Sequence, residues 1–194
     1  MMKLLVPKRY LMFIIETATQ RVLEIFYRFP DKEFSLSDLA KEADVAKANM
    51  HTILTKLYKA DLIEITKLTK IWRIRAKQRS WEYIRRKIVY NLSFVYNSGV
   101  VEFLNDHFHN PKAVVLFGSF RKGEDIAGSD IDIAVESDVV TQYTTTNLRE
   151  LANVEKSIGR KIQIHVFNRA DVDVNVFNNI ANGVVLSGFL EVKP

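Results

Sequence analysis

The segment from Ala113 to Glu136 constrains the fold most, because its pattern fits two strands joined by a polar turn. Ala113–Phe117 is a continuous apolar run that ends at a glycine, which is typical of a buried central strand. From Asp130 to Val135, isoleucine and valine alternate with aspartate and alanine. This period of two predicts a second strand with one polar face.

Strands and helices alternate over the rest of the carboxy-terminal part. We expect a helix at 144–158 and a third strand at 162–167. The fold class predicted for residues 111–194 is therefore α/β (α+β), a small domain built on a mixed sheet.

Paired carboxylates stand at the start of the second strand. Asp130 and Asp132 are two residues apart, so their side chains point the same way and lie roughly 6.6 Å apart along the chain. Two carboxylates so placed can hold divalent ions between them. Gly118 allows a tight turn after the first strand, and the helix start that follows offers amide hydrogens and the Ser119 hydroxyl to phosphate oxygens.

A Gly-Ser pair followed about ten residues later by Asp-x-Asp resembles the nucleotidyltransferase superfamily that includes DNA polymerase beta. The likeness is closest to the minimal nucleotidyltransferases and covers residues 111–191. The matching positions are Gly118, Ser119, Arg121, Gly123, Ser129, Asp130 and Asp132.

The resemblance implies a nucleotide site in which Ser119 contacts phosphates and the two aspartates are catalytic and bind Mg²⁺ (or Mn²⁺). A nucleoside triphosphate would be the ligand or substrate. The other nucleotide-binding candidates are Gly118, Arg121, Lys122 and Ser129. Because minimal nucleotidyltransferases often act as antitoxins, the resemblance also makes a helical toxin protein a candidate partner.

The chain departs from the family pattern in the third strand. Members carry a third carboxylate where this chain has Gln163, within Arg160–His165. A neutral amide cannot take a proton from an attacking hydroxyl, so catalytic turnover is questionable. His165 lies on the same face by alternation, either as a base or metal ligand or as a plain hydrogen-bonding residue.

The amino-terminal part has a different pattern, three helices followed by a hairpin. Apolar residues recur at helical spacing from Val22 to Phe29, and Pro30 ends that helix. Ser35 can cap a second helix, and a third places Met50, Ile53, Leu54 and Leu57 on one face. Two strand-like runs follow at 63–66 and 71–74.

This order resembles winged-helix transcription regulators, which predicts a winged helix-turn-helix domain at residues 1–80 that binds double-stranded DNA. Residues 1–92 carry a net charge of +9 and residues 93–194 carry −4, so the basic part suits a polyanion. Winged helices also dock proteins, and that alternative stays open. The DNA-binding candidates are Lys47, Asn49, His51, Thr52, Lys56, Lys70 and Arg73.

Residues 81–110 are expected to form a helical linker of one or two helices. Its aromatic residues, together with the apolar run Leu11–Ile15, predict a homodimer. That run is too short to span a bilayer and no signal-peptide cleavage site follows it, so we expect a cytoplasmic protein without a membrane partner.

The chain has no cysteine, which excludes disulfides, a thiolate metal site and a cysteine nucleophile. Three functions remain. One is a DNA-binding transcription regulator whose carboxy-terminal domain binds a magnesium-nucleotide. The second is an active nucleotidyltransferase that modifies a protein or small molecule. The third, implied by the family resemblance, is an interaction protein that acts as an antitoxin beside a helical toxin partner.

Overall fold

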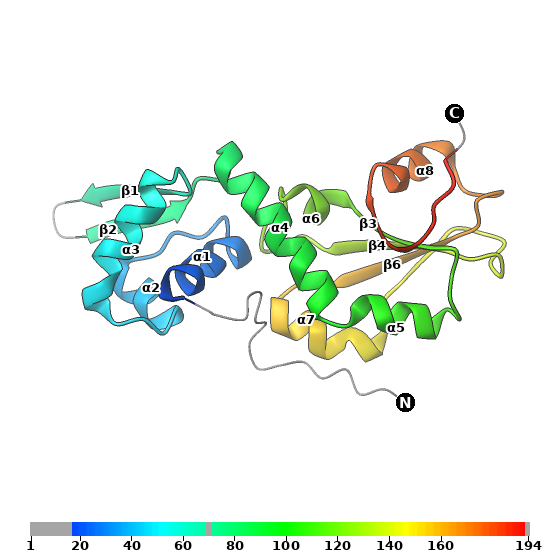
Figure 1. The fold of residues 1–194 in the computed structure, drawn as a ribbon, viewed down its shortest axis with the longest axis horizontal. Coiled ribbons are helices and arrows are strands. Elements are labelled where there is room, and N and C mark those ends of the chain that lie inside the picture. Colours follow the sequence, from blue (N-terminus) through cyan, green and yellow to red (C-terminus); the bar gives the residue numbers. More distant parts are fainter. Residues whose placement is uncertain (1–16, 69–70, 193–194) are drawn as a thin grey trace. The chain divides into compact units, whose positions relative to one another are not determined.

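The computed structural model describes residues 17–68 and 71–192 (Figure 1). The run Leu11–Ile15 and the DNA-binding candidate Lys70 lie outside these ranges. The described residues form two compact units, one ending at Tyr90 and the other beginning at Asn91. Among them, no helix combines the length and the hydrophobicity of a membrane-spanning segment.

The first unit contains three helices followed by an antiparallel hairpin. The helices are α1 (Ala18–Arg28), α2 (Leu36–Glu42) and α3 (Lys47–Lys59), and the hairpin pairs β1 (Ile63–Leu68) with β2 (Ile71–Ala76). A bridge between Phe34 and Ile74 adds a short third strand segment. The predicted order of elements in this part is confirmed.

Side chains at helical spacing explain these helices. Thr17 caps α1 in a capping box with Gln20, and Ser35 caps α2 by accepting a hydrogen bond from the Asp38 amide. The core of the unit includes the predicted apolar face of α3. That face consists of Met50, Ile53, Leu54 and Leu57, all buried.

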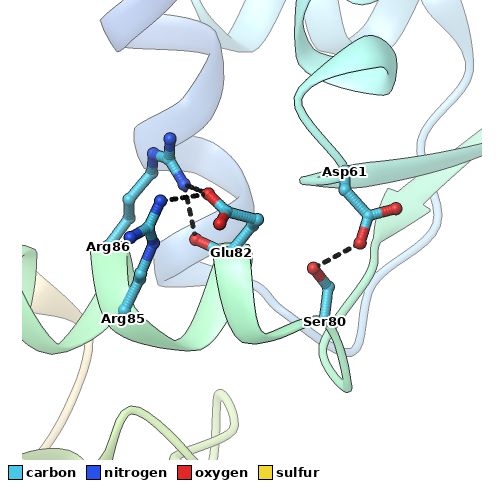
Figure 2. Close-up of polar contacts among 5 residues, drawn as sticks. All are labelled: Asp61, Ser80, Glu82, Arg85 and Arg86. Carbon is cyan, nitrogen blue, oxygen red and sulfur yellow. Dashed lines mark hydrogen bonds and ion pairs between the residues drawn. The ribbon is translucent and has the colours of Figure 1, made fainter.

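Polar contacts fix the segment between the hairpin and the long helix α4 (Trp81–Asn97) (Figure 2). Asp61, in the left-handed conformation at φ 62°, accepts a hydrogen bond from the Ser80 hydroxyl at 2.6 Å. In the first turn of α4, the Glu82 carboxylate accepts hydrogen bonds from both Arg85 and Arg86. These two arginines are therefore already paired within the first turns of the helix.

The second unit is a five-stranded mixed sheet in the order β5-β6-β4-β3-β7. Strands β4 and β6 are parallel and the other neighbours are antiparallel, so the predicted mixed sheet is confirmed. The strands are β3 (Ala113–Phe117), β4 (Ile131–Glu136), β5 (Thr144–Thr146), β6 (Ile162–Phe167) and β7 (Val184–Gly188).

The helices of this unit lie on both sides of the sheet (Figure 1). They are α5 (Val100–His107), the short α6 (Gly118–Lys122), α7 (Ala152–Ile158), which follows a 3₁₀ turn at Arg149–Leu151, and α8 (Val174–Ala181). On one side, Leu104 of α5 and Val154 of α7 pack with Leu116 and Ile133 of the sheet. On the other side, Ile180 of α8 packs with a second set of sheet residues, Ala113, Val115, Ala134 and Phe167.

The helix predicted for 144–158 is wrong in its first half. Thr144–Thr146 forms β5, which pairs antiparallel with β6, and regular helix begins only at Ala152. Three consecutive β-branched threonines favour an extended backbone, and the open edge of β6 supplies the partner strand.

The expected linker consists of the two helices α4 and α5, separated by Gly99 in the left-handed conformation. Both helices contribute to hydrophobic cores. Tyr83 and Tyr90 belong to the core of the first unit, whereas Phe94, Val95 and Leu104 belong to the core of the second.

Candidate functional site

The site is built where three neighbouring strands bring polar residues onto one face of the sheet. In the register, Asp132 of β4 stands opposite Phe117 of β3 and opposite Gln163 of β6. His165 follows two residues after Gln163 and therefore shares its face. The alternation expected from the sequence thus places Asp132, Gln163 and His165 on the same side.

Gly118 makes direct room for the Asp132 carboxylate. It has φ +73°, and a Cβ added there would lie 2.3 Å from Asp132 Oδ2. Glycine is needed at this turn both for its backbone conformation and because the carboxylate takes the space of a side chain.

The other oxygen of Asp132 contacts His165. His165 Nε2 lies 3.2 Å from Asp132 Oδ1, and His165 Nδ1 is hydrogen-bonded to the Tyr143 hydroxyl. The imidazole is buried and stands edge-on to Phe117, at 4.8 Å between ring centroids. A neutral imidazole satisfies both contacts when Nε2 donates to the carboxylate and Nδ1 accepts from the tyrosine.

Tyr143 was missed by the sequence analysis. It precedes β5, and only the pairing of β5 with β6 brings its hydroxyl to His165. Burial first, and then the negative charge of Asp132, raise the pKa of Tyr143 above its ordinary value. The phenol therefore stays protonated at neutral pH and can donate to His165.

These contacts favour one of the alternatives for His165. Because both ring nitrogens are engaged by protein groups, neither is free to take a proton from a substrate or to bind a metal ion. His165 is best explained as a positioning residue that orients the Asp132 carboxylate.

The remaining motif residues surround this centre. Asp130 is exposed and immediately precedes β4, and Ser119 is half-buried in α6. The Ser129 hydroxyl accepts a hydrogen bond from the Ile126 amide at 3.0 Å, so it closes the turn before Asp130. Ser129 thus has a structural partner within the loop.

A pocket of about 480 Å³ lies beside the Gly118 turn. It brings together three of the predicted nucleotide-binding residues, Gly118, Arg121 and Lys122. Phe117 and two residues of α8 and its C-terminal end, Asn179 and Asn182, complete the lining. The sequence analysis missed both asparagines because α8 lies beyond the motif and meets it only in the folded sheet.

The fit to a divalent metal ion depends on the two aspartates. Within residues 17–68 and 71–192, no group of three or more His, Cys, Asp or Glu side chains is arranged to hold an ion. Mg²⁺ is commonly bound by one or two carboxylates together with substrate phosphates and water. Asp130 and Asp132 therefore fit an ion that arrives with a phosphate ligand rather than one held by protein alone.

The DNA-binding candidates that the structure describes lie on the surface of the first unit. Those of α3 are all exposed, namely Lys47, Asn49, His51, Thr52 and Lys56. Arg73 on β2 is exposed, and its Nε lies 3.7 Å from Glu33 Oε2. The Trp72 ring lies 5.8 Å from His51 and under the Lys67 ammonium at 4.5 Å, so the hairpin packs next to the exposed face of α3.

One family model matches part of the second unit. Residues 99–188 match the family described as polymerase beta, nucleotidyltransferase. This match begins earlier than the motif-based resemblance and takes in α5. Comparisons with curated proteins and with solved structures gave no significant match. The match indicates a nucleotidyltransferase-type domain, which extends from the start of α5 to the end of β7.

Proposed function

We propose that the nucleotidyltransferase-type domain binds a nucleoside triphosphate together with Mg²⁺ (or Mn²⁺). The observation that carries this proposal is the Asp132 carboxylate, fitted against Gly118 and held by His165. Beside it, Arg121 and Lys122 line one pocket with Gly118. Cations next to a fixed carboxylate suit a ligand that has both phosphates and a divalent counter-ion.

In this proposal each side chain has a separate task. Arg121 and Lys122 attract the phosphates, and the Ser119 hydroxyl offers a further hydrogen bond to them. Asp130 and Asp132 would hold the ion. When bound, Mg²⁺ neutralises phosphate charge and aligns the phosphate for in-line attack.

We further propose that the domain binds its nucleotide without efficient transfer. Gln163 stands next to Asp132 in the register, where a third carboxylate would complete the set, and an amide accepts no proton at ordinary pH. His165 does not replace it, because its two nitrogens are engaged. The active-transferase alternative, which includes an antitoxin role beside a helical toxin, is favoured by the intact Gly118, Ser119, Asp130 and Asp132.

Calorimetric titration of the full chain tests nucleotide binding directly. ATP, CTP, GTP and UTP are each titrated in the presence of Mg²⁺ and, separately, Mn²⁺. Saturable binding of at least one nucleotide is expected. Absence of binding for all four with both ions would contradict the proposal and leave the domain as a scaffold.

Gln163→Asp is expected to raise nucleotidyl transfer above the wild-type level. The new carboxylate would lie opposite Asp132 on the neighbouring strand, where it can bind the ion and accept a proton from an attacking hydroxyl. General-base catalysis contributes about 10²–10⁴-fold in enzymes, so an increase of at least about tenfold is expected. Incorporation of label from the four radiolabelled nucleotides into the protein itself or into added acceptors measures the change.

Gln163→Glu and Gln163→Asn are the controls for this gain. The first adds the same charge on a longer side chain, and the second shortens the amide without adding charge. Robust transfer by the wild-type protein, unchanged in Gln163→Asp, would favour the active-transferase alternative and contradict the role given to Gln163.

For the first unit we propose a winged-helix fold that binds double-stranded DNA, which fits a transcription regulator. Three helices, a hairpin and an exposed polar face on α3 next to the hairpin support this assignment. In such an arrangement α3 enters the major groove and the hairpin contacts the backbone. The +9 charge of residues 1–92 supplies sequence-independent attraction.

The triple variant Lys47→Ala, Lys56→Ala and Arg73→Ala is expected to bind duplex DNA at least about tenfold more weakly than wild type. Each cation that no longer neutralises a phosphate also makes the dependence of log affinity on log salt less steep by about 0.9. Fluorescence anisotropy with a labelled duplex at several salt concentrations measures both quantities.

A charge-matched control removes three exposed cations from the second unit, at Arg149, Lys156 and Lys161. Its DNA affinity and salt dependence should stay close to wild type. Equal losses in the two triple variants would mean that net charge alone governs binding, and they would overturn the assignment of the α3 surface.

A further inference from the structure

The pocket beside Gly118 is formed by three elements. Phe117 is the last residue of β3, Arg121 and Lys122 belong to α6, and Asn179 and Asn182 stand at the end of α8. Its volume of about 480 Å³ falls in the range of about 300–1,000 Å³ that is usual for small-molecule sites. The chemistry of the lining differs from one side of the pocket to the other.

Helix α8 presents the side chains of Asn179 and Asn182 to this pocket, because the opposite face of the helix is buried. Ile180 is fully buried in a cluster with sheet residues, and Val176, Phe177 and Ala181 pack against the same cluster. Asn179 and Asn182 are three residues apart, which puts them on one face of the helix. Both carboxamides therefore face the same region.

The end of α8 is held close to β3. Gly183 follows Asn182 directly, and a Cβ added there would lie 2.5 Å from the Leu116 carbonyl oxygen. This close approach places Asn182 next to the strand that ends at Phe117. Both Asn179 and Asn182 are exposed, and the Asn182 carboxamide donates to the Asn178 carbonyl oxygen at 2.8 Å, which fixes its orientation.

Two kinds of recognition chemistry thus meet in one pocket. The guanidinium of Arg121 and the ammonium of Lys122 attract phosphate, but these contacts do not distinguish one base from another. A carboxamide offers one acceptor and two donors, the combination with which asparagine reads the edge of a nucleobase. The half-buried Phe117 ring adds an aromatic surface on which a base can pack.

We propose that Asn179, with Asn182 beside it, binds the nucleobase of a nucleoside triphosphate whose phosphates lie against Arg121 and Lys122. This inference rests on the nucleotide site proposed above and adds to it the element that selects the base. Helix α8 is then the specificity element of the domain, and the Gly118 turn lies between the pocket and Asp132.

The test compares a complete nucleotide with its phosphate part alone. The full-length protein is titrated with ATP, CTP, GTP, UTP and inorganic tripolyphosphate, all with Mg²⁺. Wild type should bind one or more nucleotides more tightly than tripolyphosphate. Asn179→Ala should lower the affinity for the preferred nucleotide by at least about tenfold and leave the affinity for tripolyphosphate unchanged, because the variant removes only the interaction with the base.

Two further variants make this result specific. Asn178→Ala changes the neighbouring exposed asparagine of α8, which does not line the pocket, and should leave every affinity unchanged. The double variant Arg121→Ala and Lys122→Ala should bind both the nucleotide and tripolyphosphate more weakly than wild type, by a similar factor. Thermal unfolding of Asn179→Ala should match wild type, since alanine is favourable at an exposed helical position.

The outcomes separate this inference from the proposed function. Base recognition by α8 is overturned, while the nucleotide site stands, if wild type and Asn179→Ala bind nucleotides equally well. The same holds if Asn179→Ala loses as much affinity for tripolyphosphate as for the nucleotide. Base recognition is overturned in the same way if wild type binds tripolyphosphate as tightly as every nucleotide. If wild type binds none of the five probes, the proposed function and this inference both fail.

Discussion

Gly118→Ala is expected to lower nucleotide affinity by at least about tenfold, or about 1.4 kcal/mol. The added methyl group would lie 2.3 Å from Asp132 Oδ2, far inside contact distance, so the carboxylate must leave its position. Movement of Asp132 also breaks its contact with His165 Nε2, which orients it. Calorimetric titration with the four nucleotides and Mg²⁺ measures the loss.

Gly159→Ala is the matched control for this substitution. Gly159 has the same φ of +73°, but a Cβ there would meet nothing within 4 Å. It therefore carries the cost of a left-handed alanine, about 1–2 kcal/mol of stability, without a clash. Its nucleotide affinity should equal that of wild type. Equal affinity in Gly118→Ala and Gly159→Ala would contradict the role assigned to the Gly118–Asp132 contact.

Arg160→Ala is expected to destabilise the second unit by about 3–5 kcal/mol. Arg160 and Asp125 form an ion pair at 2.8 Å, and their side chains are only 1% and 0% exposed. Asn91 of α4 donates to the same carboxylate at 2.8 Å and to the Phe120 carbonyl oxygen at 2.7 Å. Removing the guanidinium breaks this buried ion pair, so the burial of the Asp125 charge is less well compensated.

Lys161→Ala provides the control one residue away. Lys161 forms an ion pair with Glu155 at 3.2 Å, but its side chain is 70% exposed, so its removal should cost less than about 1 kcal/mol. Both tryptophans, Trp72 and Trp81, precede Asn91, so tryptophan fluorescence does not report on the second unit. Unfolding in urea is therefore followed by circular dichroism. Equal losses in the two variants would show that the buried pair contributes no more than the exposed one.

Local sequence patterns predicted the strands that carry the motif. Ala113–Phe117 and Ile131–Glu136 are strands as expected, because a continuous apolar run and a period of two are properties of the segments themselves. The common face of Asp132, Gln163 and His165 also follows from alternation once β4 and β6 are neighbours.

What sequence reasoning missed depends on contacts between distant segments. Thr144–Thr146 became an edge strand because β6 offers it a partner, and that pairing alone brings Tyr143 to His165. Asn179 and Asn182 reach the Gly118 turn through the packing of α8 on the sheet. No spacing within the Gly-Ser and Asp-x-Asp motif contains this information.

The metal dependence of nucleotide binding tests the central claim most directly. The full chain is titrated with the nucleotide it prefers, with Mg²⁺ and with a chelator, for wild type and for the double variant Asp130→Asn and Asp132→Asn. We expect wild type to bind only with Mg²⁺, because two unscreened carboxylates repel the phosphates. The double variant should lose this dependence. Equal wild-type affinity with and without the ion, or an unchanged dependence in the double variant, would contradict a magnesium-nucleotide site at these aspartates.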